Sequence, residues 1–314
     1  MKKSLVNILR LLRPRQWIKN LAIFAAITFT GRLFDLPTFE KVFIGFLVFC
    51  SLSSGLYIIN DIFDREKDRL HPFKRFRPIA DRNISIFVAL IISVVLIIAS
   101  LISAFFVTRA FFLLVICYLL IRIAYSAFLK QIAVIDILIL ASGYILRVYA
   151  GEFASGLHIS VWLLLTTISL SLFLAIGKRR SELTLVSDLP AQEIKLIRKS
   201  LSHYSERLLD VYASIFATSI FISYALFTFL ENPRGFKISF ELFLPSFLPD
   251  FFQRKWLMIT IIPVVYGLMR YLQDVYEKHE GESPEKVLLS DIPLLITVII
   301  WIMMVIGIIY VIGG

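Results

Sequence analysis

Long apolar runs follow one another through almost the whole of this 314-residue sequence. The runs at 84–107 and 287–312 are nearly uninterrupted, and each exceeds the roughly 20 helical residues that cross the hydrocarbon core of a bilayer. A chain folded in water could not bury so much apolar surface, because 58% of the residues are hydrophobic and only 18% are charged. The sequence therefore predicts an all-α integral membrane protein.

The apolar runs define one membrane domain that covers 1–314. Its first part, 1–16, is basic and amphipathic, which predicts a lead-in that lies on the membrane surface. The Phe-rich segment 238–253 is predicted to lie at the outer interface. Nine spans are predicted, near 18–33, 41–62, 84–107, 109–128, 132–150, 159–177, 207–230, 255–275 and 287–312.

Basic residues are distributed unequally between the connections. The N-terminal tail and the loops at 64–83 and 178–206 are rich in Lys and Arg, which places them on the cytoplasmic side by the positive-inside rule. We therefore expect a multi-pass protein of the inner (cytoplasmic) cell membrane whose N-terminus and active site face the cytoplasm. The net charge of +10 does not indicate nucleic acid as a partner, because the basic residues cluster beside helix ends, near lipid headgroups.

The most informative polar cluster lies where the second predicted span ends. At about 100° per residue, Asn60, Asp61, Asp64 and Asp68 project from roughly a quarter of the helix circumference. Crowded carboxylates repel one another, and a hard divalent cation relieves that repulsion. These oxygen ligands therefore predict a Mg²⁺ site that also takes phosphate oxygens. The alternative is a solvated helix end whose aspartates pair with Arg65, Lys67 and Arg69.

A basic loop follows the acidic cluster at once. Pro72 and Pro78 prevent a helix from continuing through it, so Lys74, Arg75 and Arg77 are presented beside the carboxylates. Guanidinium groups match phosphate oxygens bidentately, and lysine acts as a point charge. We interpret the loop as a binding site for substrate phosphate, and contact with anionic lipid is the alternative.

A second polar cluster, Gly177-Lys178-Arg179-Arg180-Ser181-Glu182, opens the sixth-to-seventh loop. It has the same cytoplasmic position in the second half of the chain as the acidic cluster has in the first. Lys178 and Arg179 are predicted to form a cationic wall that faces the metal site and binds an anionic substrate. The alternative is that Lys178 and Glu182, spaced i and i+4, form an ordinary pair on a helix surface.

Isolated polar residues in apolar helices are further candidates, because intramembrane charges usually face the protein interior or a cavity. Lys19 enters the first span, and Tyr125 and Lys130 end the fourth. Arg147 in the fifth span lies either near the outer end or at the central cavity. Asp136 lies about three turns earlier on nearly the same face and is the candidate partner of Arg147.

Taken together, these features resemble the UbiA superfamily of membrane prenyltransferases over essentially the whole chain. Typical members carry a second Asp-rich motif in the second half, where this sequence is basic. The runs RPRQWIKN, NDIFDREKDRLHPFKRFRPIA, ILRVYAGEFA and GKRRSEL, and Tyr125-Ser126 followed by Lys130, resemble the branch formed by decaprenyl-phosphate phosphoribosyltransferases.

The resemblance implies a helical bundle around a central cavity with a cytoplasmic polar cap. It implies Mg²⁺-dependent transfer of 5-phosphoribose from phosphoribosyl diphosphate to a polyprenyl phosphate, with release of pyrophosphate. The roles assigned are catalysis by Asp61, Asp64, Lys178 and Arg179, and substrate binding by Lys19, Asn60, Lys74, Arg75, Arg77, Tyr125, Lys130, Arg147 and Glu182.

Two other functions stay open at this point. One is transfer of a prenyl group from its diphosphate to an aromatic or lipid acceptor, which the basic second motif disfavours. The other is transport of an anionic lipid, which is disfavoured because the dense charges lie at one interface and not near the bilayer midplane. The sequence does not fix the polyprenol length or the oligomeric state, and a homo-oligomer is compatible with it.

Overall fold

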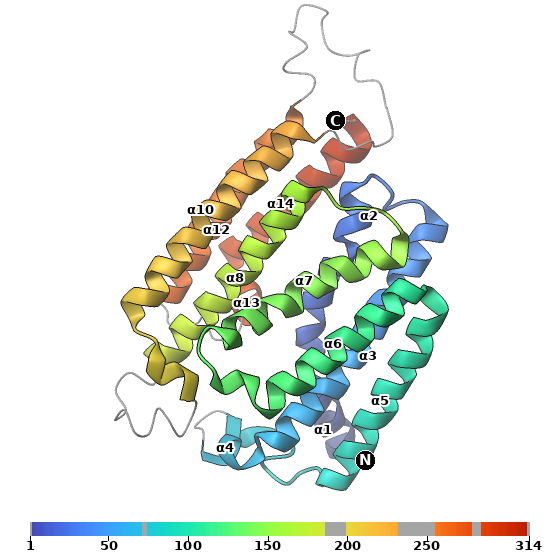
Figure 1. The fold of residues 1–314 in the computed structure, drawn as a ribbon, viewed down its shortest axis with the longest axis vertical. Helices are drawn as coiled ribbons and strands as arrows, with labels where there is room; N and C mark the ends of the chain where they lie inside the picture. The colour runs from blue at the N-terminus through green and yellow to red at the C-terminus, as the bar shows by residue number, and fades with distance from the viewer. Residues whose placement is uncertain (1, 71–73, 186–198, 232–254, 278–283, 313–314) are drawn as a thin grey trace, which may run out of the picture.

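The chain folds into a bundle of long helices that run alongside one another (Figure 1). The structure, a computed structural model, describes residues 2–70, 74–185, 199–231, 255–277 and 284–312. Every regular element in those ranges is a helix. The all-α membrane fold expected from the apolar runs is thereby confirmed.

Eight of the described helices are long and apolar enough to cross a membrane. Each matches one of the last eight predicted spans to within a few residues at most ends. The predicted interfacial segment 238–253 lies outside the described residues. The eight are α3 (Leu36–Phe63), α5 (Ile86–Val107), α6 (Arg109–Ala127), α7 (Ile135–Ser155), α8 (Val161–Thr184), α10 (Glu206–Leu230), η6 with α12 (Trp256–Glu277), and α14 with most of η7 (Ile292–Val311).

Short helices connect the long ones. Those on the side of the acidic cluster are α4 (Arg65–Leu70), η2 (Lys74–Phe76), η3 (Leu129–Gln131), η4 (Lys199–His203) and α13 (Pro284–Ser290).

The first predicted span, 18–33, differs from the expectation. After α1 (Lys2–Leu12), the chain forms a 3₁₀ helix, η1 (Pro14–Phe24), and then the short α2 (Ala25–Phe29). The prediction of one continuous α-helix there is wrong. A 3₁₀ helix rises about 2.0 Å per residue and an α-helix about 1.5 Å, so η1 and α2 together extend roughly 30 Å. That length is close to the thickness of a bilayer core.

The 3₁₀ geometry sorts the side chains of this segment into three rows. Because the helix has three residues per turn, residues i and i+3 lie above one another. Trp17 and Asn20 belong to a row that packs on α3, where the Trp17 indole donates to Ser54 Oγ at 3.0 Å. Leu21 belongs to an exposed row. The rows are Arg13–Gln16–Lys19, Trp17–Asn20–Ile23 and Arg15–Ile18–Leu21.

The end of η1 lies directly against α7, and a glycine allows this contact. A β-carbon placed on Gly151 would lie 1.8 Å from the carbonyl oxygen of Ile23, which is far inside van der Waals contact. The absence of a side chain at Gly151 therefore fixes how closely the first segment packs on the bundle.

Gly151→Ala is expected to destabilise the protein, because the backbone of η1 must move away from α7. Overpacked interiors lose roughly 1–3 kcal/mol, which thermal unfolding of the purified chain in detergent would detect. Gly267→Ala on α12 is the matched control, since its new β-carbon would meet side-chain atoms at an ordinary 3.9 Å. Equal unfolding temperatures for Gly151→Ala and the unaltered chain would contradict the close contact.

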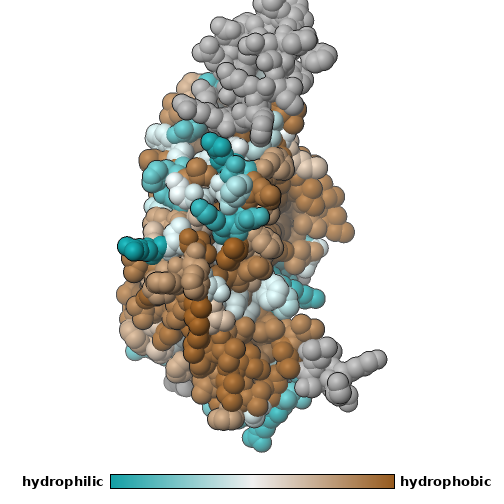
Figure 2. Space-filling view, turned by 90° about the vertical axis from the view of Figure 1, so that its right-hand side faces the viewer, coloured by the Kyte–Doolittle hydropathy of each residue, from teal (hydrophilic) through white to brown (hydrophobic). Residues whose placement is uncertain are grey.

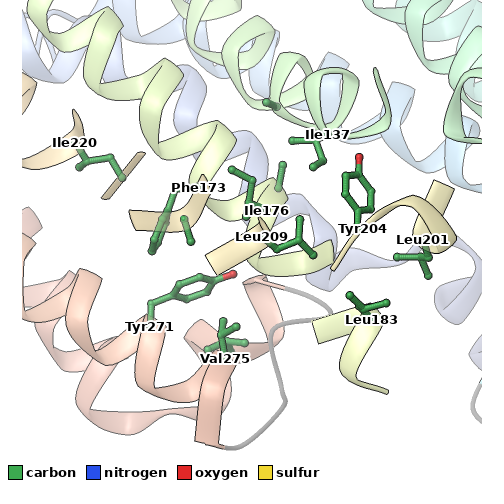
Figure 3. Close-up of a cluster of buried hydrophobic side chains, with 14 of the residues drawn as sticks. Ile137, Phe173, Ile176, Leu183, Leu201, Tyr204, Leu209, Ile220, Tyr271 and Val275 are labelled. Carbon is green, nitrogen blue, oxygen red and sulfur yellow. The ribbon is translucent and has the colours of Figure 1, made fainter. Parts of the chain in front are cut away.

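The two largest hydrophobic clusters each pack mainly within one half of the bundle. The first joins η1, α2, α3, α6 and α7 and includes Phe49, Phe111 and Tyr118. The second joins α8, α10 and α12, where the rings of Phe173 and Tyr271 lie 5.4 Å apart (Figure 3). Hydrophobic side chains also cover much of the outer face seen in Figure 2, as expected of a surface that contacts lipid.

Candidate active site

A polar cavity of about 190 Å³ lies between η1, α3, α6, α7, α8 and α13. Fifteen of the twenty residues that line it have polar or ionisable side chains. Nine residues predicted from the sequence to form the site are among them. They are Lys19, Asn60, Asp64, Asp68, Arg77, Tyr125, Arg147, Lys178 and Glu182.

The acidic end of the cavity forms where α3 stops. The helix ends at Phe63, Asp64 forms its C-cap, and the chain resumes as α4. Asn60, Asp64 and Asp68 line the cavity. Asp61 does not line it; its side chain is only 2% exposed.

Basic residues from distant parts of the chain neutralise the three aspartates. Arg13 Nη2 lies 2.6 and 2.7 Å from the two carboxylate oxygens of Asp61. Arg77 Nη1 bridges Asp61 at 3.0 Å and Asp68 at 2.7 Å. Lys130 pairs with Asp64. Each of the three carboxylates therefore has at least one cationic partner.

The alternative pairing proposed for the helix end is not observed. Arg65 and Arg69 both bind Glu66, which is exposed. The side chain of Lys67 lies outside the described residues.

Burial and ion pairing shift pKa values at this end. Burial raises the pKa of the Asp68 carboxyl, although the ion pair with Arg77 opposes that effect. For Arg77, burial acts to lower the pKa, but Asp61 and Asp68 outweigh it and the pKa is raised. A neighbouring cation, either Arg77 or a bound metal ion, favours the ionised form of Asp68 against the effect of burial.

The oxygen atoms of this end fit a hard divalent cation. Asn60, Asp64 and Asp68 offer amide and carboxylate oxygens to the cavity. In the part of the chain that the structure describes, no three His, Cys, Asp or Glu side chains converge as a complete metal cage. Mg²⁺ usually takes one or two carboxylates and completes its shell with water and substrate phosphates. These residues suit that kind of site.

The second motif lies on a helix and not in a loop, because α8 continues to Thr184. Lys178 lines the cavity and forms no hydrogen bond or ion pair with any described residue. Glu182 pairs with Arg179 and not with Lys178. The interpretation of Lys178 and Glu182 as a surface pair is therefore wrong, and the Lys178 ammonium can bind a substrate anion.

Arg179 occupies a different position from the one expected of a substrate-binding residue. It is fully buried and does not line the cavity. Its Nε lies 2.7 Å from Asp136 Oδ2, and its Nη2 donates to the Tyr125 hydroxyl at 2.9 Å. Since Tyr125 and Glu182 do line the cavity, Arg179 orients residues that face it.

Asp136 is the partner of Arg179, so the expected pair between Asp136 and Arg147 is wrong. The Asp136 carboxylate also accepts hydrogen bonds from Ser200 at 2.9 Å and Tyr204 at 2.6 Å. Burial and the hydrogen bond to Asp136 raise the pKa of the Tyr204 hydroxyl.

Arg147 faces the cavity and not the outer end of the bundle. It is 4% exposed; its Nε donates to Asn20 Oδ1 at 2.6 Å and its Nη2 to the Tyr118 hydroxyl at 2.9 Å. Arg122 of α6, a charge in an otherwise apolar helix, also lines the cavity. Its guanidinium lies 5.2 Å from the centre of the Tyr125 ring.

Besides Arg179, two more of the predicted basic residues are not at the cavity. Lys130 is buried beside Asp64 without lining the cavity, and Arg75 is exposed, with its guanidinium 4.8 Å from the centre of the Phe76 ring. The side chain of Lys74 lies outside the described residues.

Glu285 of α13 is the most unexpected member of the site. It lines the cavity, pairs with Lys19 at 2.9 Å and accepts a hydrogen bond from Gln16. Burial acts to raise the pKa of its carboxyl, but the ion pair with Lys19 outweighs burial and the pKa is lowered. Other lining residues that were assigned no role from the sequence are Arg13, Gln16, Tyr57, Arg122 and Tyr144.

The site can be compared with known proteins. Residues 21–290 match the model of the UbiA prenyltransferase family. A decaprenyl-phosphate phosphoribosyltransferase of Mycolicibacterium smegmatis is 35% identical over 305 residues, covering 96% of this chain and 92% of that protein. One of Corynebacterium glutamicum is 33% identical over 309 residues, covering 97% and 87%.

A solved structure shows the same fold. The UbiA homologue from Archaeoglobus fulgidus bound to GPP and Mg²⁺ superposes with a TM-score of 0.68 at 21% identity. The match covers 96% of this chain and 99% of that chain.

Proposed function

The chain belongs to the UbiA prenyltransferase family, and from that premise we propose that it transfers 5-phosphoribose from phosphoribosyl diphosphate to a polyprenyl phosphate, releasing pyrophosphate. It is a multi-pass membrane transferase. The names of the relatives from M. smegmatis and C. glutamicum support this choice of reaction.

The observation that carries the proposal is the polarity of the cavity. Its lining includes six basic residues and four carboxylates, together with tyrosines and amides. Phosphoribosyl diphosphate carries phosphate groups and hydroxyls over most of its surface, and the charged and hydrogen-bonding side chains of this lining can bind them. In prenyl transfer the reacting carbon belongs to the hydrocarbon chain, so the start of that chain would have to enter this cavity, for which the lining supplies mainly Leu140, Leu174, Ala175 and Pro284. In the proposed reaction only the phosphate of the polyprenyl lipid must reach the ribose. Burying polar groups against hydrocarbon is unfavourable.

The proposed reaction needs no strong general base. An oxygen of the lipid phosphate attacks C1 of the ribose, the bond from C1 to the diphosphate oxygen breaks, and pyrophosphate leaves with the electron pair. The attacking phosphate is already anionic near neutral pH. Mg²⁺ held by Asp64 and Asp68, with Asn60, would neutralise charge that develops on the leaving diphosphate.

The protein's own cations complete the site. Lys178 supplies a fixed positive charge to a substrate phosphate, while Arg179 holds Tyr125 in place through a hydrogen bond. Arg13 and Lys130 form ion pairs with Asp61 and Asp64 and hold these carboxylates in position. By the positive-inside rule, the basic loops support a cytoplasmic position for this end of the bundle, where a soluble sugar diphosphate would be available.

Turnover by the purified chain tests the proposal. With ribose-labelled phosphoribosyl diphosphate, Mg²⁺ and a polyprenyl phosphate, we expect label in the lipid extract and an equal amount of pyrophosphate. Chelation of the metal should abolish both. With geranylgeranyl diphosphate and 4-hydroxybenzoate, no product is expected. A prenylated aromatic product, without pyrophosphate from phosphoribosyl diphosphate, would overturn the proposal in favour of ordinary prenyl transfer.

A further inference from the structure

Two guanidinium groups approach the same small space on α7. A β-carbon placed on Gly143 would lie 3.6 Å from Arg147 Nη1 and 3.9 Å from Arg122 Nη1. Arg122 comes from α6 and Arg147 from α7, and all three residues line the cavity. The missing side chain of Gly143 leaves open the space toward which both arginines point.

Neither arginine has an acidic partner among the described residues. Arg147 donates to neutral groups, namely Asn20, Tyr118 and the carbonyl of Gly143. Arg122 forms no hydrogen bond or ion pair with the described chain and lies over Tyr125.

Three of the four other cations of the cavity are different in this respect, and only Lys178 likewise has no described ion-pair partner. Arg13, Lys19 and Arg77 are each matched to a carboxylate at 3.0 Å or less. The pair at Gly143 is therefore a concentration of positive charge that the protein itself leaves uncompensated.

Two like charges close together in a mostly buried site repel each other, and buried charges are normally paired. An anion between them would remove the repulsion. Guanidinium groups bind phosphate bidentately, and two of them suit a dianion with three terminal oxygens. A carboxylate ligand has a single negative charge and would neutralise only one of the two guanidinium groups.

The pair lies at the opposite end of the site from the aspartates. Arg122 is five residues before the end of α6, and Gly143 is eight residues after the start of α7. At 1.5 Å per residue, the pair lies roughly 10 Å inside the bundle. Asp64, in contrast, caps the end of α3. A diphosphate at the acidic end leaves this inner place for another phosphate group.

We propose that Arg122 and Arg147, with Gly143 between them, form a binding site for a phosphate monoester at the inner end of the cavity. The site deepens the proposed phosphoribosyl transfer and rests on it for its role in turnover. Two groups of the proposed reaction have this chemistry: the 5-phosphate of phosphoribosyl diphosphate and the phosphate of the polyprenyl lipid.

Binding measurements without metal test the site separately from turnover. The full chain in detergent with a chelator would be titrated calorimetrically with ribose 5-phosphate and with farnesyl phosphate. Arg122→Gln should weaken binding of one or both by roughly 10- to 100-fold, because charge-assisted hydrogen bonds are lost. Loss confined to ribose 5-phosphate assigns the site to the donor, and loss confined to farnesyl phosphate assigns it to the lipid.

Gly143→Ala is the second variant, because its methyl group would occupy the space between the arginines without a close clash. It should weaken the same ligand while the unfolding temperature does not fall. Gly267→Ala, a helical glycine of α12 away from the cavity, should bind as the unaltered chain does.

Unchanged affinity of Arg122→Gln and Gly143→Ala for both ligands would overturn the site. Failure of the unaltered chain to bind either ligand would also overturn it. If the variants lose binding but the unaltered chain never releases pyrophosphate from phosphoribosyl diphosphate, the proposed reaction fails while the phosphate site stands.

Discussion

Asp64→Asn should reduce turnover by a factor of about 10² to 10³, since removal of one group that stabilises charge in the transition state commonly has an effect of this size. Asp64 lines the cavity and offers its carboxylate to a divalent cation. Asparagine keeps the shape and an acceptor oxygen for Lys130 but loses the negative charge. Pyrophosphate release measured across a Mg²⁺ titration would check the result.

Glu66→Gln is the matched control for this substitution. Glu66 lies two residues away, is exposed and binds only Arg65 and Arg69 among the described residues. It should retain full turnover. Near-normal turnover by Asp64→Asn at every Mg²⁺ concentration would show that Asp64 does not act through a metal ion.

Asp61→Asn is expected to lower the stability of the fold, because Asp61 is buried against two arginines.

Arg179→Gln should destabilise the fold more than any other single change considered. Arg179 and Asp136 are both fully buried. Removing one member of a buried ion pair costs about 3–5 kcal/mol, because the other charge remains in a medium of low polarity. Unfolding of the purified chain, followed by heat or denaturant, would measure the loss.

Neighbouring residues supply the controls. Arg180→Gln removes the next arginine, which binds the more exposed Glu206 and Asp210, and should cost no more than about 1 kcal/mol. The double variant Arg179→Gln with Asp136→Asn should recover part of the loss, since no buried charge is then left from that pair. Equal stability of Arg179→Gln and Arg180→Gln would contradict the buried pair.

The long helices could be predicted because a bilayer imposes a single requirement on the sequence. An apolar run of sufficient length satisfies it, and α5 and α14 show it almost without interruption. The type of helix formed by residues 14–29 could not be predicted in this way, because hydropathy measures the polarity of a segment and not its pitch. Nothing in the composition of η1 distinguishes three residues per turn from 3.6.

The site was predictable where its residues adjoin one another in the chain. Helical spacing grouped Asn60, Asp64 and Asp68, which all line the cavity, whereas Asp61 at the edge of that face turns to Arg13 and Arg77. Partners between helices were not predictable.

Two residues illustrate the limit. Asp136 was assigned the nearest arginine on its own helix, whereas Arg179 reaches it from α8. Glu285 was missed because a single charge in a connection carries no pattern. Its role arises when α13 packs over η1.

The repeat of η1 links its length to the direction in which each side chain points. Removing or adding one residue before Lys19 would turn the positions that follow by about 120° and exchange the rows that face the cavity, α3 and the exposed side. A change of three residues would return every row to its own neighbours. A change in the length of this segment therefore preserves the direction of its three rows of side chains only when it adds or removes a multiple of three residues.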